Sequence, residues 1–171
     1  MKNTQKAVLI SAILALCAFL FFGTGSAADV FPAFSTQDID GKEVTGAIFA
    51  DKKLTVVNIW TTWCPPCIGE MPDLGKLARS MPEGSQLIGV ILDAYDPGAL
   101  DEAGKILSKA GAQFPQLLPS DEMAPVLDEV EAIPTTVFVD ASGKIVGNPL
   151  VGSRSEEAYR AEIKKILNTI K

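Results

Sequence analysis

Two cysteines separated by two prolines are the residues of this sequence with the clearest chemical potential. Cys64 and Cys67 lie in the stretch WCPPCIGEMP, residues 63–72, and they are the only cysteines outside the N-terminal hydrophobic run. Cysteines at this spacing serve as a redox couple, as half of a metal site or as a structural staple. The rest of the sequence has to discriminate among these three.

Composition argues against the metal site and the staple. A tetrahedral zinc site needs four ligands, and the chain offers one cysteine pair and no histidine. The lack of histidine also excludes His-based triads and the C-x-x-C-H haem attachment signal. A disulfide across two residues closes a very short loop, so it constrains the unfolded chain little. We therefore interpret the pair as a redox couple that needs no metal and no further cofactor.

Strand and helix patterns alternate through residues 29–171, which predicts an α/β fold with a central mixed β-sheet flanked by helices. The length suits one domain with a full hydrophobic core. We expect an N-terminal hairpin around an Asp40-Gly41 turn, strands over 53–60 and 85–95, helices over 97–111, 120–130 and 155–171, and a hairpin over 135–152 that turns at Ser142-Gly143.

The cysteines lie where the strand over 53–60 passes into a helix. An apolar stripe predicts this helix and the face that it buries: Ile68, Met71, Leu74, Leu77, Ala78 and Met81. A helix N-terminus carries free N–H groups and positive potential, which lower the pKa of a thiol placed there. We expect Cys64 to be the exposed attacking thiolate, and Cys67 to be the shielded thiol that resolves the mixed disulfide.

The residues between the cysteines predict the direction of electron flow. Pro65 and Pro66 have no N–H groups, which leaves the N–H of Cys67 to stabilise a thiolate, and no histidine adds positive charge. We therefore expect a thiol pKa and a reduction potential nearer to those of thioredoxin, about 7 and roughly −270 mV, than to the strongly oxidising extreme near −120 mV, which would make the pair a reductant.

Glu70 follows Cys67 by three residues and so shares a face of the expected helix with it. A carboxylate in this place can accept the proton of the resolving thiol, and it raises the pKa of nearby thiols by repulsion. A solvated surface glutamate is the alternative, because most glutamates lie on the surface. The residues alone leave both interpretations open.

The stretches VVNIWTTWCPPCIGEMP (56–72) and AIPTTVFVDASGKIV (132–146) resemble the thioredoxin-like TlpA/ResA family of exported or membrane-tethered bacterial thiol-disulfide oxidoreductases. The similarity extends over residues 31–170. The resemblance implies a three-layer thioredoxin-like fold with an N-terminal β-hairpin and an extra strand–helix insertion between about residues 85 and 130. It also implies a functional glutamate at Glu70. Asn58 stands where thioredoxins carry a buried aspartate, and an amide cannot act as a base.

The same resemblance implies which residues meet the substrate. Pro134 matches the family's cis-proline, and the backbone of Ile133 is expected to pair with an extended substrate segment. Trp63, Pro65 and Pro66 are expected to border the approach to the cysteines, whereas Trp60 is expected to pack in the core. Family members devoted to cytochrome c maturation often carry a polar residue between the cysteines, so Pro65 leaves the substrate open.

The N-terminal segment predicts export. Two lysines precede an apolar run over residues 7–22, and small residues close the pattern at Ala28. We expect a signal peptide over residues 1–28 that is cut after Ala28, and a mature domain over 29–171 outside the cytoplasm, in the periplasm or at the outer face of the cytoplasmic membrane. A retained membrane anchor in residues 7–28 and lipid attachment at Cys17 are the alternatives.

Charge narrows the partners of the mature domain. Residues 29–171 carry 13 basic and 21 acidic residues, a net charge of −8. This balance disfavours nucleic acid and anionic membrane surfaces as partners. Protein disulfides or dithiols, and a membrane or exported thiol as electron donor, are the partners expected.

The sequence predicts an extracytoplasmic thiol-disulfide oxidoreductase that reduces protein disulfides, with apocytochrome c as one candidate substrate. Three alternatives remain: a disulfide-forming oxidase, a thiol peroxidase and a non-catalytic redox sensor. Thiol peroxidases of this fold carry a motif similar to Pro-x-x-x-Thr-x-x-Cys around their active cysteine, and the stretch NIWTTWCPPC lacks the proline of that motif. The potential of the cysteine pair separates reductase from oxidase, and turnover with insulin separates either from a sensor.

Overall fold

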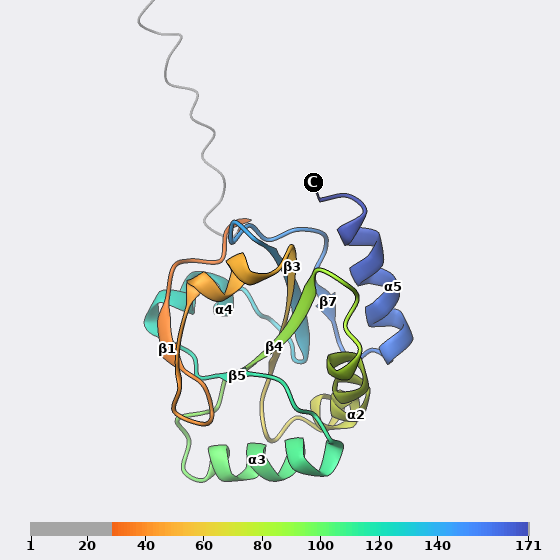
Figure 1. Ribbon diagram of the computed structural model, residues 1–171. Coiled ribbons are helices and arrows are strands. Elements are labelled where there is room, and N and C mark those ends of the chain that lie inside the picture. The colour runs from red at the N-terminus through yellow and green to blue at the C-terminus, as the bar shows by residue number, and fades with distance from the viewer. Residues whose placement is uncertain (1–28, 171) are drawn as a thin grey trace, which may run out of the picture.

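A five-stranded mixed sheet forms the centre of the computed structural model, which describes residues 29–170 (Figure 1). The sheet order is β5 (Gln116–Leu117), β4 (Ser85–Ile91), β3 (Leu54–Trp60), β6 (Thr135–Asp140) and β7 (Leu150–Val151). β3 runs parallel to β4 and antiparallel to β6. All seven residues of β3 are buried, as expected for a strand with neighbours on both edges and cover on both faces.

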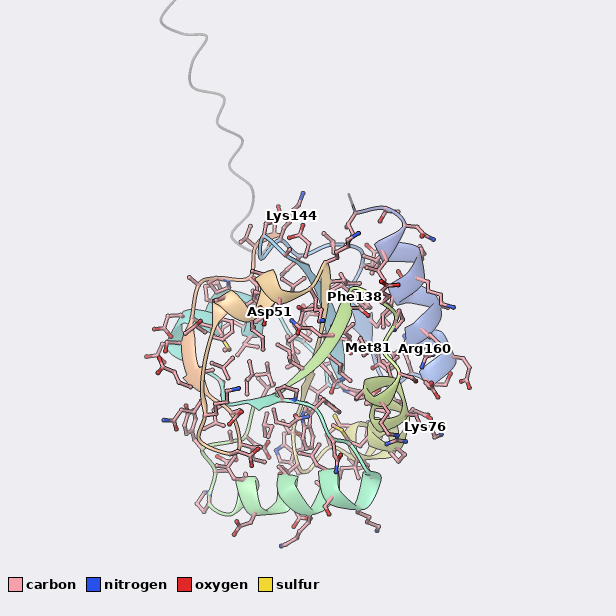
Figure 2. The ribbon with its side chains drawn as sticks, in the orientation of Figure 1. Asp51, Lys76, Met81, Phe138, Lys144 and Arg160 are labelled. Atoms are coloured by element: carbon pink, nitrogen blue, oxygen red, sulfur yellow. A yellow bond between two sulfur atoms is a disulfide. The ribbon has the colours of Figure 1, made fainter. Side chains whose placement is uncertain are left out.

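Helices cover one face of this sheet. They are α2 (Pro65–Arg79), α3 (Ala99–Ala110) and α5 (Glu156–Leu167), and Figure 1 shows α5 along one side of the sheet with α3 beyond the end of α2. Alternate residues of β3 point into this layer, where Leu54, Val56 and Trp60 pack against the buried stripes of the helices. Phe138 of β6, labelled in Figure 2, joins the same cluster.

Shorter elements cover the other face. They are the 3-10 helices η3 (Gly46–Asp51) and η4 (Asp121–Met123) and the single-turn helix α4 (Ala124–Leu127). Phe31, Phe34 and Phe49 meet edge to face beneath them, with ring centroids 5.2 to 5.9 Å apart. The predicted N-terminal hairpin is confirmed as β1 (Ser35–Gln37) and β2 (Glu43–Thr45), and Gly41 has the positive φ that its turn needs.

Several sequence expectations need correction. The strand expected over 85–95 ends at Ile91, and the helix expected over 120–130 forms only η4 and the single turn of α4. The return strand of the hairpin expected over 135–152 is broken: after the Val139–Ile145 bridge, Gly147 with a φ of 71° and then Pro149 interrupt it, so that only β7 pairs regularly with β6. Ile68, expected in the buried stripe of α2, is 38% exposed. The buried stripe runs instead through Cys67, Glu70, Met71, Leu74, Gly75 and Leu77, which leaves Ile68 at its edge.

Other expectations are confirmed. Ser155 caps α5 by accepting a hydrogen bond from the N–H of Ala158, and Gly111 ends α3 in the left-handed conformation. The expected extra segment between residues 85 and 130 contains β5, which adds an edge strand next to β4. The predicted signal peptide or anchor over residues 1–28 lies outside the described residues. Within residues 29–170, no helix has the length and apolarity needed to cross a membrane.

Gly75 lets α2 approach the end of α3 closely. A Cβ at this position would lie 2.8 Å from the carbonyl oxygen of Gly111, a backbone atom that cannot swing away. We expect Gly75→Ala to lower the free energy of unfolding by about 1–3 kcal/mol, measured by urea denaturation. Gly104→Ala inside α3 is the matched control, because open space surrounds its Cβ position and alanine favours a helix by about 1 kcal/mol. Equal stabilities of the two variants would contradict this packing.

Candidate active site

The cysteines lie at the junction of β3 and α2, as the sequence predicts. Cys64 is the N-cap of α2 and is joined to Cys67 by a disulfide. The backbone N–H of Cys67 donates to the Cys64 Sγ over 3.3 Å. Pro65 and Pro66 occupy the first two helical positions and bring no N–H group, so the N–H of Cys67 is the first that α2 directs at the sulfur.

The first sulfur is less exposed than the sequence predicts. The Cys64 side chain is only 3% exposed and Cys67 is fully buried, and both belong to the hydrophobic cluster beneath the helices. In this oxidised state the Sγ of Cys64 is bonded to the Sγ of the buried Cys67. Pro65 and Pro66 are exposed beside it.

Asp93 holds the segment that leads to Cys64. This residue follows β4, is 8% exposed, and accepts hydrogen bonds from both the N–H and the hydroxyl of Thr62. Trp63, next in the chain, is 67% exposed, whereas Trp60 is fully buried and donates its indole N–H to Gln116. The expected division between a surface tryptophan and a core tryptophan is therefore confirmed. Asp93 was not predicted from the sequence.

A surface hollow of about 400 Å³ lies beside the disulfide segment. Trp63 and Ile133 both line it, together with Asp93, so that two of the expected substrate-contacting residues meet on one surface. The Ile133–Pro134 peptide bond is cis, as the resemblance implies. Thr135 pairs with Ile59, so Pro134 lies beside the end of β3 that leads to the cysteines.

Glu70 is buried, 2% exposed, and points into the protein rather than into solvent. Its Oε1 accepts a hydrogen bond from the Asn58 amide at 2.9 Å, and its Oε2 accepts from the Tyr159 hydroxyl at 2.9 Å and from the N–H of Arg154 at 3.1 Å. Burial raises the pKa of the Glu70 carboxyl, and these three donors offset part of that effect. The solvated-surface interpretation of Glu70 is therefore wrong.

Two hydrogen-bond partners of Glu70, Tyr159 and Arg154, were not predicted from the sequence, and neither was Thr136, which bonds to Tyr159. Tyr159 lies on the apolar stripe of α5 with Ile163 and Ile166, so the pattern indicates only a core residue. Burial and the negative charge of Glu70 raise the pKa of Tyr159, so its hydroxyl is a hydrogen-bond donor at any physiological pH. Asn58 stands where thioredoxins carry a buried aspartate, and its amide donates a hydrogen bond to Glu70.

Metal-ligating side chains do not gather at this site. Among residues 29–170, no group of three or more histidine, cysteine, aspartate or glutamate residues is placed to hold a metal ion. At the start of α2 the structure brings together the sulfur of its N-cap Cys64, the sulfur of Cys67 and the buried carboxyl of Glu70.

Comparison with known proteins decides the family. The Redoxin family matches residues 26–167, which include the disulfide, Glu70 and the cis-proline. The chain belongs to the Redoxin family.

Similar proteins narrow the activity of this Redoxin-family protein. It is 30% identical over 141 residues to the thiol:disulfide interchange protein DsbE homolog of Paracoccus denitrificans, covering 80% of this chain and 74% of that protein. It is 29% identical over 136 residues to the thiol-disulfide oxidoreductase ResA of Bacillus thuringiensis, covering 79% and 75%.

A solved structure supports the same assignment. It is a thiol:disulfide interchange protein of the thioredoxin family from Chlorobium tepidum, with a TM-score of 0.68, 26% identity, and coverage of 84% of this chain and 99% of that one. The sequence resemblance and the thioredoxin-like fold are confirmed. The protein is a thiol-disulfide oxidoreductase with a Cys64–Cys67 pair.

Proposed function

We propose that this protein is an extracytoplasmic reductase of protein disulfides. The observation that carries the proposal is the position of Cys64 at the N-cap of α2, where the N–H of Cys67 points at its sulfur. That arrangement favours the thiolate form of Cys64. The disulfide itself is the redox group, and the reaction needs no other cofactor.

The reaction takes place in two steps with Cys64 as nucleophile. In the reduced protein, the Cys64 thiolate attacks one sulfur of a substrate disulfide, which forms a mixed disulfide and releases the other substrate sulfur as a thiolate. The Cys67 thiol then passes its proton to the Glu70 carboxylate, and its sulfur attacks the Sγ of Cys64. The Cys64–Cys67 bond forms, the second substrate sulfur leaves, and the substrate has gained two electrons. An exported or membrane-bound thiol donor reduces the disulfide again.

Glu70 suits the proton-accepting role for two reasons. It shares a face of α2 with Cys67, three residues away, and both side chains are buried. Burial raises the pKa of its carboxyl, which brings the affinity of this carboxyl for a proton nearer to that of a thiol.

The substrate segment is proposed to lie in the hollow between Trp63 and Ile133. There the backbone beside the cis Pro134 pairs with an extended chain, and the exposed Pro65 and Pro66 border the point of attack. Apocytochrome c before haem attachment is one candidate for this substrate.

Export is proposed from the first 28 residues, with their lysines, apolar run and closing small residues. The sequence resemblance to exported and membrane-tethered oxidoreductases supports this location. Fractionation of cells that produce the full chain, with N-terminal sequencing of the product, distinguishes cleavage after Ala28 from a retained anchor in residues 7–28 or a lipid on Cys17.

The reduction potential tests the direction of the reaction. Equilibration of the Cys64–Cys67 pair with glutathione is expected to give a value near −270 mV, because the cysteines enclose two prolines and no cationic side chain. Insulin reduction with dithiothreitol as electron donor is expected to proceed over many turnovers. A potential above about −150 mV would assign the protein to the oxidases. Failure to cycle with insulin would instead favour a redox sensor.

A further inference from the structure

The buried carboxyl of Glu70 and three other side chains form a closed hydrogen-bonded ring. Asn58 of β3 donates from its Nδ2 to Glu70 Oε1 at 2.9 Å and to Thr136 Oγ1 of β6 at 3.1 Å. The Tyr159 hydroxyl of α5 donates to Glu70 Oε2 at 2.9 Å and lies 3.1 Å from Thr136 Oγ1. The ring therefore joins β3, α2, β6 and α5.

The hydroxyl protons of this ring point one after the other toward the carboxylate. The Tyr159 hydroxyl has one proton, which it donates to Glu70, so the proton of Thr136 must point toward the Tyr159 oxygen. A hydroxyl can turn its proton from one partner to the other. When Glu70 gains a proton on Oε2, that proton can point to Tyr159, and the Tyr159 proton can turn to Thr136. The Thr136 proton must then turn away from Tyr159, since only one of the two hydroxyls can donate in the bond between them. With that rotation, the Tyr159 hydroxyl can match either protonation state of the carboxyl.

The Tyr159 hydroxyl is not needed to fill the core. The side chain is fully buried in the layer between α5 and the sheet, where Phe138 is also fully buried. A phenylalanine at position 159 would fill almost the same space. A buried hydroxyl carries a desolvation cost unless it is hydrogen-bonded, and the partners of this one are Glu70 and Thr136.

Two arginines hold α5 and the loop before it in place. Arg160 donates to the carbonyl oxygen and the hydroxyl of Ser80, at 2.6 and 2.7 Å, and so ties α5 to the end of α2 (Figure 2). Arg154 donates from its guanidinium to the carbonyls of Val151, Gly152 and Ser153. This bracing holds the loop whose backbone N–H reaches Glu70 Oε2.

Glu70 also lines a hollow of about 370 Å³ that opens to solvent. Pro66, Gly69 and Asp73 of α2 form one side of it, and residues 153–155 form the other. Glu70 therefore lies between the buried ring on one side and this surface hollow on the other.

We propose that Tyr159 is a positioning residue for the reaction: its hydroxyl holds the Glu70 carboxyl in one orientation and determines the pH range over which Glu70 can accept the proton of Cys67. The proposal rests on the proposed role of Glu70 as that acceptor. Tyr159 acts on the reaction only through the Glu70 carboxyl, to which its hydroxyl donates.

The charges around Glu70 are few, so the effect of one hydroxyl should be measurable. Arg154 is the cation whose charge lowers the Glu70 pKa, Asp73 is the other acid that lines the hollow, and Asn58 and Thr136 are uncharged. A hydrogen bond to a charged group favours the charged form by about one to two pKa units. Loss of the Tyr159 donor should therefore shift the titration of Glu70 upward.

The test compares Tyr159→Phe with Tyr95→Phe, which removes the only other tyrosine hydroxyl of the chain. Tyr95 is 72% exposed, and its hydroxyl donates to Pro119. In the oxidised protein, carbon-13 NMR of the Glu70 carboxyl is expected to titrate about one to two pH units higher in Tyr159→Phe and as in the wild type in Tyr95→Phe. This readout does not depend on activity.

The second measurement isolates the resolving step. Ellman's reagent attaches a nitrothiobenzoate group to Cys64 of the reduced protein, and stopped-flow absorbance follows its release when Cys67 attacks. The pH profile of this release is expected to move upward with the Glu70 titration in Tyr159→Phe. Thr136→Val, which deprives Tyr159 of its own donor, is expected to move both readouts in the same direction by less. Thermal melts establish that each variant is folded.

The outcomes separate this proposal from the one on which it rests. If Glu70→Gln slows the release but Tyr159→Phe changes neither the carboxyl titration nor the pH profile, Tyr159 only fills space and the present proposal is wrong. A carboxyl titration that moves without the pH profile also overturns it, because the hydroxyl then does not act on the reaction. If Glu70→Gln leaves the release unchanged, the proposed role of Glu70 fails first.

Discussion

Replacement of Cys64 by serine is expected to lower insulin reduction by at least about a thousandfold, whereas Cys67→Ala is expected to stop the reaction at a covalent intermediate. The difference follows from position. Cys64 is the N-cap of α2 and receives the N–H of Cys67, while Cys67 is one turn further along and fully buried. A hydroxyl cannot replace the thiolate nucleophile, and loss of the nucleophile removes nearly all catalysis.

The Cys67→Ala variant serves as a trap for the native partner. Once Cys64 has attacked a substrate disulfide, no second sulfur is present to release it, so the mixed disulfide accumulates. We expect full-length Cys67→Ala, produced in the native cells, to yield adducts that migrate faster after treatment with a reductant and that mass spectrometry can identify. Cys64→Ser is the control and should yield none. Equal amounts of adduct in the two variants would show that Cys64 is not the nucleophile. A lack of any adduct would remove the support for a protein substrate.

Local signals explain why the cysteine site could be predicted from the sequence. The run over residues 53–60 becomes β3, and the prolines after Cys64 become the first residues of α2, so the strand–helix junction is encoded within a dozen neighbouring residues. The same holds for the turn at Asp40-Gly41 and for the Ser155 cap. Each of these features depends on residues that are close together along the chain.

Features that depend on distant contacts could not be predicted. The helical period shows that Glu70 shares a face with Cys67, but only the packing of α5 and β3 against α2 shows that this face is buried. Tyr159 is 89 residues from Glu70, and Arg154 is 84 residues away. No local pattern marks either residue as a partner of a carboxyl, because a tyrosine on an apolar stripe indicates only a core.

Ile68 and Cys64 show how small shifts in packing decide exposure. Ile68 lies one position from the centre of the buried stripe of α2, and a helix turns by about 100° for each residue, so this displacement leaves it 38% exposed. Cys64 was expected to be open to solvent, and it lies instead in the hydrophobic cluster with Cys67. This burial depends on residues that are distant along the chain, such as Phe138 and Tyr159, which a local sequence pattern does not encode.

Glu70→Gln is expected to slow the resolving step by about a hundredfold near neutral pH while the first attack by Cys64 keeps its rate. A positioned proton acceptor contributes about a hundredfold or more, and the amide has the shape of the carboxyl without its basicity. The amide has nearly the shape of the carboxyl, but Asn58 must turn its own amide to accept from the new Nε2, which removes its hydrogen bond to Thr136. Stopped-flow release of nitrothiobenzoate from Cys64 measures the second step separately from the first. Glu83→Gln, at an exposed glutamate in the loop after α2, is the matched control.

Glu70→Gln is expected to gain stability relative to the wild type as the pH rises, although it loses activity. Burial raises the Glu70 pKa above its ordinary value of 4.5, so the folded protein holds the proton more tightly than the unfolded chain does. As the pH rises above about 4.5, the unfolded chain ionises first, and the wild type loses stability until the folded Glu70 ionises too. Glutamine has no such loss, so the stability of Glu70→Gln relative to the wild type should rise over this range and then level off. Urea denaturation at a series of pH values measures the difference, and a difference that falls with pH would mean that the hydrogen bonds of Glu70 outweigh its burial.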